Sequence, residues 1–296
     1  MDNSTKKLIT HDGSFHTDDV FAAAALSIYL ENKGENFEII RTRDEEIIKS
    51  GDYVFDVGGV YDADAKRFDH HQPGGAGERE NKIPYSSFGL VWKAYGTELA
   101  GTEAAAKILE DKLVAPVDAF DNGVVLTEKK YDIMPYIIQF IFFAMHPTWV
   151  EGVERADEFF LKSVNIAKEV LKREIIQTRD ALAAEDMVRK FYDSSPDKRI
   201  VVMDRKYPFQ EVLIAMPEPL FAVYPRSDGS WSAKAILADL RSFTNRKNFP
   251  SAWAGLGGEE LEKASGVSGA VFCHRGLFLA VAKTKEGAIA LAKKAL

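Results

Sequence analysis

Short apolar runs alternate with helical patterns over the first 125 residues of the chain. Strands are predicted at Lys7–Thr10, Phe37–Arg41, Tyr53–Val57 and Lys66–Phe68, and helices at Val20–Leu30, Glu45–Lys49, Ser87–Tyr95 and Gly101–Leu113. Asp18 or Asp19 is placed to cap the helix that begins near Val20. Strand-helix alternation of this kind predicts an α/β fold with a mainly parallel sheet covered by helices on both faces.

A long helical pattern follows from Trp149 to about Tyr192, with apolar residues at helical spacing and no Gly or Pro after Gly152. The remaining segments predict a smaller α/β domain, with strands at Ile200–Met203, Leu220–Tyr224, Ser232–Ile236, Ala270–His274 and Leu277–Ala282 and a closing helix at Lys285–Leu296. We therefore expect an N-terminal domain over residues 1–148, a helical connector over 149–196 and a C-terminal domain over 197–296.

The bulk properties narrow the class of protein. A chain of 296 residues favours more than one hydrophobic core. No apolar run approaches the roughly 18 residues that span a bilayer, and the first ten residues are too weakly patterned for a signal or transit peptide. Cys273 is the single cysteine, which excludes an internal disulfide and a cysteine zinc cluster. We expect a cytoplasmic protein without a membrane partner.

The charge is unevenly spread along the chain. The net charge of −7 argues against a protein that coats nucleic acid through bulk charge. Residues 1–196 carry 23 Lys and Arg against 35 Asp and Glu, whereas residues 197–296 carry 15 against 10. This asymmetry suggests metal ligands in the first part and anion-binding groups in the second, although solvated surface charge explains most of these residues.

Four of the six histidines fall in two tight groups, and each group adjoins carboxylates. Two further aspartates follow an apolar strand and a helical stretch. The candidate residues are His11, His16, Asp18, Asp56, Asp69, His70, His71 and Asp121. Ligands of open α/β sheets bind at the carboxyl ends of the strands, so these groups can converge on one cleft. A lone histidine beside an aspartate is usually structural, but the conjunction of four groups predicts a dinuclear metal site.

Mixed imidazole and carboxylate ligands suit divalent ions such as manganese. Two ions about 3.5–4 Å apart need a bridging carboxylate, and together they lower the pKa of a shared water enough to supply hydroxide at neutral pH. A phosphoester is a natural substrate, because its developing negative charge would lie against two cations.

These motifs resemble a known family. The segments His11–Val20 (HDGSFHTDDV), Phe55–Gly59 (FDVGG) and Arg67–Gln72 (RFDHHQ) are similar to the Myg family, the melanocyte-proliferating-gene type exonucleases. The resemblance covers nearly the whole chain, since Asn245–Leu256 and Gly269–Phe278 look like C-terminal signatures of that family. More distantly, the family resembles the Asp-His-His (DHH) phosphoesterases, which include single-strand exonucleases, oligoribonucleases and manganese pyrophosphatases.

The resemblance implies two divalent ions, Mn²⁺ with Mg²⁺ or Co²⁺ as alternatives. One ion would be held by His11, His16 and Asp56, and the other by Asp18, Asp56, His70 and Asp121. Asp56 would be the bridge, and Asp118 is a rival to Asp121. As catalytic residues, His71 would face the phosphate or leaving group and Asp69 would orient a histidine. The chain departs from the superfamily at His16, which replaces a carboxylate after one extra loop residue.

The second domain of such proteins grips the substrate phosphates. Candidates are His274, Arg275, Arg246 and Lys247, whereas Arg226 and Arg241 fit solvated side chains better. Trp253 and Phe249 could stack on a base, although burial in the core explains either residue more simply.

We therefore expect a metal-dependent phosphodiesterase whose substrate is RNA or a short oligonucleotide, attacked from 3′ to 5′ by a water that two metal ions activate. Hydrolysis of small phosphoesters or pyrophosphate is the alternative, and a metal-dependent binding protein without turnover is a third. The sequence indicates no oligomeric state.

Overall fold

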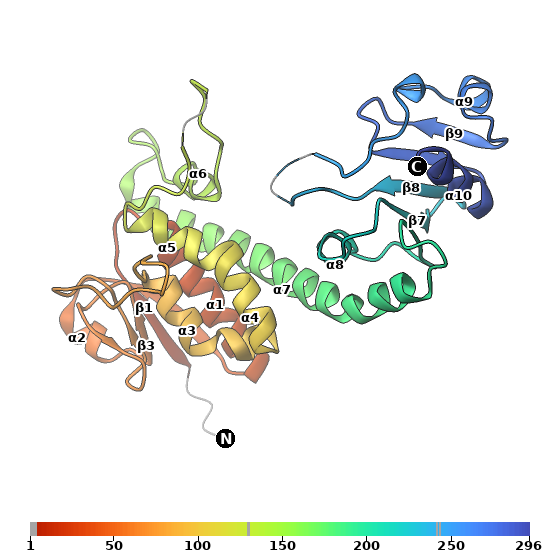
Figure 1. The fold of residues 1–296 in the computed structure, drawn as a ribbon. Coiled ribbons are helices and arrows are strands. Elements are labelled where there is room, and N and C mark those ends of the chain that lie inside the picture. Colours follow the sequence, from red (N-terminus) through yellow and green to blue (C-terminus); the bar gives the residue numbers. More distant parts are fainter. Residues whose placement is uncertain (1–4, 129–130, 241, 243) are drawn as a thin grey trace. The chain divides into compact units, whose positions relative to one another are not determined.

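The structure is a computed structural model that describes residues 5–128, 131–240, 242 and 244–296. The chain divides into two compact units, Met1–Arg179 and Asp180–Leu296 (Figure 1). The division falls inside the long helix α7 (Ala156–Ser194), which contributes residues to both units. Among the described residues, none of the helices is both long enough and apolar enough to cross a membrane.

The first unit is built on a five-stranded sheet with the order β2-β1-β3-β5-β4. Its strands are β1 (Lys6–Thr10), β2 (Phe37–Arg41), β3 (Tyr53–Phe55), β4 (Tyr61–Asp62) and β5 (Arg67–Phe68). All neighbours pair in parallel except β4, which pairs antiparallel with β5 at the edge. The predicted α/β class and mainly parallel sheet are confirmed. The sequence missed β4, because two residues are too short to show a period.

One face of this sheet is covered by α1 (Thr17–Lys33), which packs against α3 (Ser87–Ala100). Every residue of α1 from Thr17 to Leu30 is buried, so its alanine-rich sequence shows little amphipathic pattern. The other face packs against the short helix α2 (Glu45–Lys49), whose Ile48 contacts apolar residues of β1, β2 and β3. Helices therefore lie on both faces of the sheet, but the first face is covered by much longer helices than the second.

After α3 the chain continues as α4 (Glu103–Leu109), a π-helical turn (Glu110–Val114) and α5 (Ala115–Asp121). The single helix predicted at Gly101–Leu113 therefore extends much further. Two elements missed by the sequence, α6 (Ile138–Phe143) and a 3₁₀ turn (Val153–Arg155), precede α7. A long helix was expected from Trp149, but α7 begins at Ala156.

The second unit contains a five-stranded sheet with the order β6-β7-β8-β10-β9. Its strands are β6 (Ile200–Val202), β7 (Phe221–Pro225), β8 (Trp231–Ala235), β9 (Ala270–Cys273) and β10 (Leu279–Ala282). Only β6 and β7 pair in parallel. The predicted strands are all present, whereas α8 (Gln210–Ile214), a 3₁₀ turn (Ser251–Trp253) and α9 (Gly258–Ser265) were not predicted.

The two faces of the second sheet differ in their cover. One face packs against α9 and α10 (Lys285–Lys294) and encloses the larger core, in which Phe249 and Trp253 are buried. Burial was the simpler expectation for both residues, and it is the one observed. The other face packs against α8 and the end of α7, mainly over β6 and β7.

Candidate metal centre

Three parallel strands bring the sequence motifs to one edge of the first sheet. His11 directly follows β1, Asp56 directly follows β3, and the Asp69-His70-His71 triplet directly follows β5. The strands are anchored by fully buried apolar residues, among them Ile9, Phe55 and Phe68. Because the carboxyl ends of neighbouring parallel strands meet at one edge, the motifs that follow them are neighbours as well.

His11 faces two carboxylates through Nε2, which lies 3.1 Å from Asp56 Oδ2 and 3.3 Å from Asp19 Oδ2. Its other ring nitrogen, Nδ1, lies 2.8 Å from the carbonyl oxygen of Asp12 and therefore donates to it. That bond fixes the ring orientation that metal-binding histidines use. Burial opposes protonation of the ring, but attraction to Asp19 and Asp56 raises the pKa of His11 to about 10. These carboxylates therefore favour a positive charge at this position.

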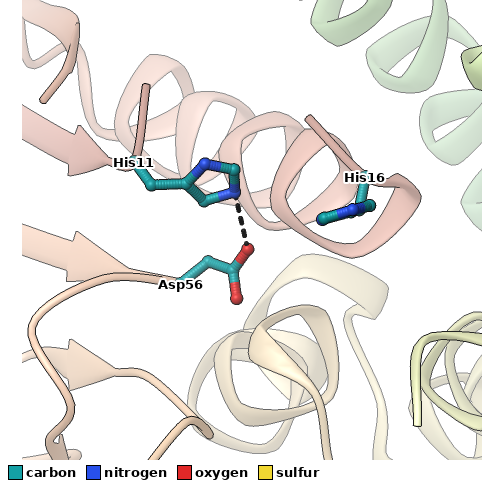
Figure 2. Close-up of side chains that lie close together, drawn as sticks. All are labelled: His11, His16 and Asp56. Carbon is teal, nitrogen blue, oxygen red and sulfur yellow. Dashed lines mark ion pairs between the residues drawn. The ribbon is translucent and has the colours of Figure 1, made fainter. Parts of the chain in front are cut away.

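His16 approaches the same carboxylates from the start of α1. Figure 2 shows His11, His16 and Asp56 converging from a strand end, a helix start and a loop. His16 occupies the N-cap position, and its backbone N–H donates to Asp19 Oδ1 over 2.9 Å. The predicted cap at Asp18 or Asp19 is therefore corrected: Asp19 bonds back to the cap residue from the first turn.

The loop between His11 and His16 is held by side chains that the sequence did not single out. Arg41 is almost fully buried and donates through Nη2 to the carbonyl oxygen of Gly13 (2.7 Å). His146 Nε2 donates to the carbonyl oxygen of Phe15 (2.6 Å), and its ring packs edge-on against the Phe15 ring. We regard Arg41 and His146 as positioning residues of this loop.

His70 lies between carboxylates from three different segments. Its Nε2 is 3.3 Å from Asp56 Oδ1, 3.3 Å from Asp121 Oδ2 and 3.9 Å from Asp18 Oδ2. Asp18 lies in the first turn of α1, whereas Asp121 is the last residue of α5. The side chains predicted for the second ion are therefore brought together here.

Ser87 is a contact residue of the centre that the sequence missed. Its hydroxyl donates to Asp56 Oδ1 (3.0 Å), and its backbone N–H donates to Asp18 Oδ2 (3.3 Å). Because Ser87 is the first residue of α3, its N–H also belongs to the positive end of that helix. A serine at a helix start is usually a cap, so the sequence carried no signal for this contact.

Asp69 organises the triplet rather than facing the other carboxylates. Oδ1 accepts from the backbone N–H groups of His70 (2.7 Å) and His71 (3.1 Å), and Oδ2 accepts from Gly59 N–H (2.5 Å). Oδ1 also lies 2.8 Å from His71 Nδ1, and this bond raises the pKa of His71. The His71 side chain remains 61% exposed, so the ring is oriented by Asp69 and still accessible.

Asp118, the rival to Asp121, lies in a different network. Its buried carboxylate accepts from Arg79 Nη2 (2.6 Å), Ser86 Oγ (2.6 Å) and Gly89 N–H (3.0 Å). These bonds occupy Asp118, whereas Asp121 is directed at His70.

The cluster fits divalent cations. Asp18, Asp19 and Asp56 are buried together, and Asp18 Oδ1 accepts no hydrogen bond from any residue the structure describes. Burial and the nearby charges of Asp56 and Asp121 raise the pKa of Asp18 well above its usual range. Buried carboxylates crowded in this way need positive charge.

Three ligand groups can be recognised in the described residues, each with its donor atoms within 4.8 Å of one another. They are His11, His16 and Asp56; Asp56, His70 and His71; and His16, Asp18 and Asp121. Asp56 is common to the first two groups. The first group has the composition predicted for one ion, but His16 also lies near Asp18 and Asp121.

A pocket of about 580 Å³ opens onto the centre. Besides His11, His16, Asp56 and the triplet residues Asp69 and His71, it is lined by Gly58, Gly59 and Arg43. Arg43 contacts Asp12 through Nε at 3.2 Å, and both side chains are more than half exposed. The ligand atoms are therefore reachable by a molecule of the size of a nucleotide.

The residues predicted to contact substrate in the second unit divide into two kinds. His274, Arg275 and Lys247 are partly or fully exposed at the β9–β10 turn and on the adjoining segment, where Phe249 N–H donates to Leu277 O. Arg246 instead donates to the carbonyl oxygens of Met216 and Ile214, so its expected substrate contact is corrected to a structural role. Arg226 pairs with Asp228 at 3.5 Å, and Arg241 lies outside the described residues.

Taken together, the fold and this edge define an α/β protein with a candidate divalent-metal centre. The MYG1 exonuclease family, described as an uncharacterised protein family (UPF0160), matches residues 7–296. The chain belongs to this family, as the resemblance predicted.

Relatives of similar length support this membership. A MYG1 protein of Chlamydia trachomatis serovar D is 34% identical, with 94% of this chain and 92% of that protein covered. A MYG1 exonuclease of Homo sapiens is 29% identical, with 97% and 85% covered. RecJ from Thermus thermophilus, solved with Mn²⁺, is 12% identical with a TM-score of 0.28, and this chain covers 51% of it.

Proposed function

We propose that the protein is a metal-dependent phosphodiesterase that removes nucleotides from the 3′ end of RNA or short oligonucleotides. The reaction class follows from the family: relatives of nearly equal length are named exonucleases, so the chain is an enzyme that hydrolyses phosphoester bonds. The observation that carries the metal dependence is the group formed by the buried Asp18 and Asp56 and the partly buried Asp121 around His70.

Two divalent ions would occupy the centre, with Asp56 as their common ligand. His11 and His16 complete one site, whereas Asp18, His70 and Asp121 complete the other. Mixed nitrogen and oxygen donors favour Mn²⁺ over ions that prefer oxygen alone. When bound, the ions supply a water nucleophile at neutral pH and offset the charge that develops on the phosphate.

The remaining residues of the pocket would handle the substrate. His71, oriented by Asp69, faces the phosphate or the leaving oxygen and can donate a hydrogen bond to it. In the second unit, Gly276 N–H donates to His274 Nδ1 (2.9 Å), so Nε2 of that ring carries a proton. His274, with Arg275 and Lys247, would then donate to substrate phosphates.

The direct test incubates the protein with Mn²⁺ and a panel of end-labelled RNA, end-labelled DNA, dinucleotides and pyrophosphate. We expect stepwise shortening of 5′-labelled RNA, which retains its label as the 3′ end is removed. A chelator-treated sample and the Asp56→Asn variant are the controls for metal-dependent turnover. Release of the 5′ label as a mononucleotide would show attack from the other end. Hydrolysis of pyrophosphate alone would support the small-substrate alternative.

A further inference from the structure

Half of one face of the second sheet carries no helix in the described part of the chain. On this side α8 and the end of α7 pack against Val201, Ala222 and Tyr224 of β6 and β7. The residues of β8, β10 and β9 beyond them form what we call the open sheet face, namely Lys234, Leu279, Val281, Phe272 and the adjoining His274.

The register of the strands aligns these side chains. Lys234 pairs with Leu279, and Val281 pairs with Phe272, so the four side chains occupy one face across three strands. His274 continues this face two residues beyond Phe272, and the two ring centroids are 6.2 Å apart. Phe272 is 38% exposed, which leaves part of its ring accessible to a ligand, whereas Val281 beside it is buried.

Two lysines at this face, Lys234 and the neighbouring Lys206, lack acidic partners among the described residues, whereas Arg226 pairs with Asp228. In the described residues, no carboxylate lies within salt-bridge distance of Lys234 or of Lys206, which precedes α8. Burial and the neighbouring charge of Lys206 lower the pKa of Lys234. Two lysines that repel one another at a partly buried position are stabilised by a bound anion.

A shallow groove extends the face toward the start of β8. It has a volume of about 450 Å³ and is lined by Val271, Phe272, Leu279 and Val281, with Ser230 and the Arg226–Asp228 ion pair at its end. The groove is therefore apolar along its middle and polar at one end, and Lys234 lies beside Leu279 on the same face. An exposed ring at Phe272 together with Lys234 and Lys206 matches a nucleic-acid strand, in which flat bases alternate with phosphates, better than it matches an apolar peptide.

We propose that the open sheet face binds a single-stranded polynucleotide, with a base stacking on Phe272 and phosphates pairing with Lys234 and Lys206. This inference rests on the proposed function, because it supplies a place for the part of the strand that is not being cleaved. Strand binding at this face also gives a use to the excess of positive charge in residues 197–296. The face extends the substrate contacts proposed for His274 and Arg275.

The test measures the binding of a labelled oligouridine of about ten nucleotides, a length within the usual site size. Fluorescence anisotropy is recorded in excess chelator, so that the strand is not cut. Phe272→Leu keeps an apolar side chain but removes the stacking ring, and binding should weaken on the order of 10-fold. Phe272→Tyr should restore it. Lys234→Gln and Lys206→Gln should each reduce the slope of log K against log salt by about 0.7.

Lys263→Gln is the matched charge control, because Lys263 is an exposed lysine on α9, which covers the opposite face. It should leave both affinity and salt slope unchanged. Lys206 and Phe272 are exposed, so their variants test the proposal even if Lys234→Gln unfolds the unit. Wild-type affinity and salt slope in Phe272→Leu and Lys206→Gln together would overturn the proposal.

Failure of the proposed function is recognised separately. Hydrolysis of bis(p-nitrophenyl) phosphate by the wild-type protein with Mn²⁺ reports on the metal centre alone. If the wild-type protein hydrolyses this diester but the variants bind oligouridine as well as the wild type does, strand binding at the open sheet face is refuted and the proposed phosphodiesterase activity is retained. If neither the diester nor RNA is hydrolysed but oligouridine binding depends on Phe272, the proposed phosphodiesterase activity is refuted and strand binding at the open sheet face is retained.

Discussion

Asp118 and Asp121 lie three residues apart and belong to different contact networks, so a substitution at each position tests which of them is the proposed ligand. We expect Asp121→Ala to lose metal affinity with little effect on the metal-free fold. Asp118→Ala should retain metal affinity and lose stability. The sequence alone left both residues open as the last ligand, so this pair tests the assignment of the whole centre.

The cost of Asp118→Ala follows from its three partners. Ser86 Oγ and Gly89 N–H would lose their acceptor, and Arg79 would keep only Glu110 as a carboxylate partner. Breaking a buried ion pair costs about 3–5 kcal/mol. Because Glu110 still offsets the Arg79 charge, we expect the lower end, about 3 kcal/mol of unfolding free energy.

Asp121→Ala should behave in the opposite way. Burial and the charge of Asp56 raise the pKa of Asp121, so its ionised form is disfavoured without a cation. Removing it should leave the metal-free protein as stable as the wild type or slightly more so. With Mn²⁺ at about 100 times Kd, the wild type gains about 2.7 kcal/mol, whereas a variant with 100-fold weaker affinity gains about 0.4 kcal/mol.

Chemical denaturation of both variants, in chelator and in Mn²⁺, measures these quantities directly. Calorimetric titration with Mn²⁺ gives the affinity and the number of ions independently. The reasoning fails if Asp118→Ala abolishes stabilisation by Mn²⁺ while Asp121→Ala keeps it. In that case Asp118 is the ligand, and α5 must present a different face to the centre.

Four further outcomes follow from the same geometry. Protein stripped by a chelator should be inactive and recover better with Mn²⁺ or Co²⁺ than with Ca²⁺, which prefers more oxygen ligands; activity in excess chelator would contradict this. Asp56→Asn should lose at least one ion and several orders of magnitude in turnover, as seen by metal analysis and initial rates. His16→Asp should raise the activity with Mg²⁺ relative to Mn²⁺, since carboxylate favours the harder ion. Replacing His274 and Arg275 by alanine should raise KM while both ions stay bound.

The centre was predictable to the extent that strand ends are predictable. His11, Asp56 and Asp69 each directly follow a segment predicted as a strand, and parallel strands bring such positions to one edge. The fold class followed from the same alternation of strands and helices. Local sequence patterns therefore predicted which segments are neighbours and which of their side chains are of the types that bind metals.

The contacts that complete the centre depend on tertiary structure. Ser87 reaches Asp56 and Asp18 only because α3 packs against α1, and a serine at a helix start looks like any cap. Arg246 follows the same rule in reverse: its sequence context fits phosphate binding, but the fold directs its guanidinium to backbone carbonyls. Tertiary packing decides whether a charged side chain is exposed to substrate, and packing cannot be read from a single sequence.

The backbone at Asp56 suggests that the centre is shaped before any ion binds. Asp56 has a φ of 56°, a value that non-glycine residues adopt rarely, and two glycines with positive φ follow at Gly58 and Gly59. Its carboxylate is held in place by Ser87, His11 and His70, and the two histidines keep its pKa below the usual range despite burial. Asp56, the proposed common ligand, is thus ionised and fixed without an ion, while Asp18 and Asp121 resist ionisation. Cation binding should therefore release protons mainly from the side chains around Asp56 rather than from Asp56 itself, and it should add stability that the apoprotein lacks.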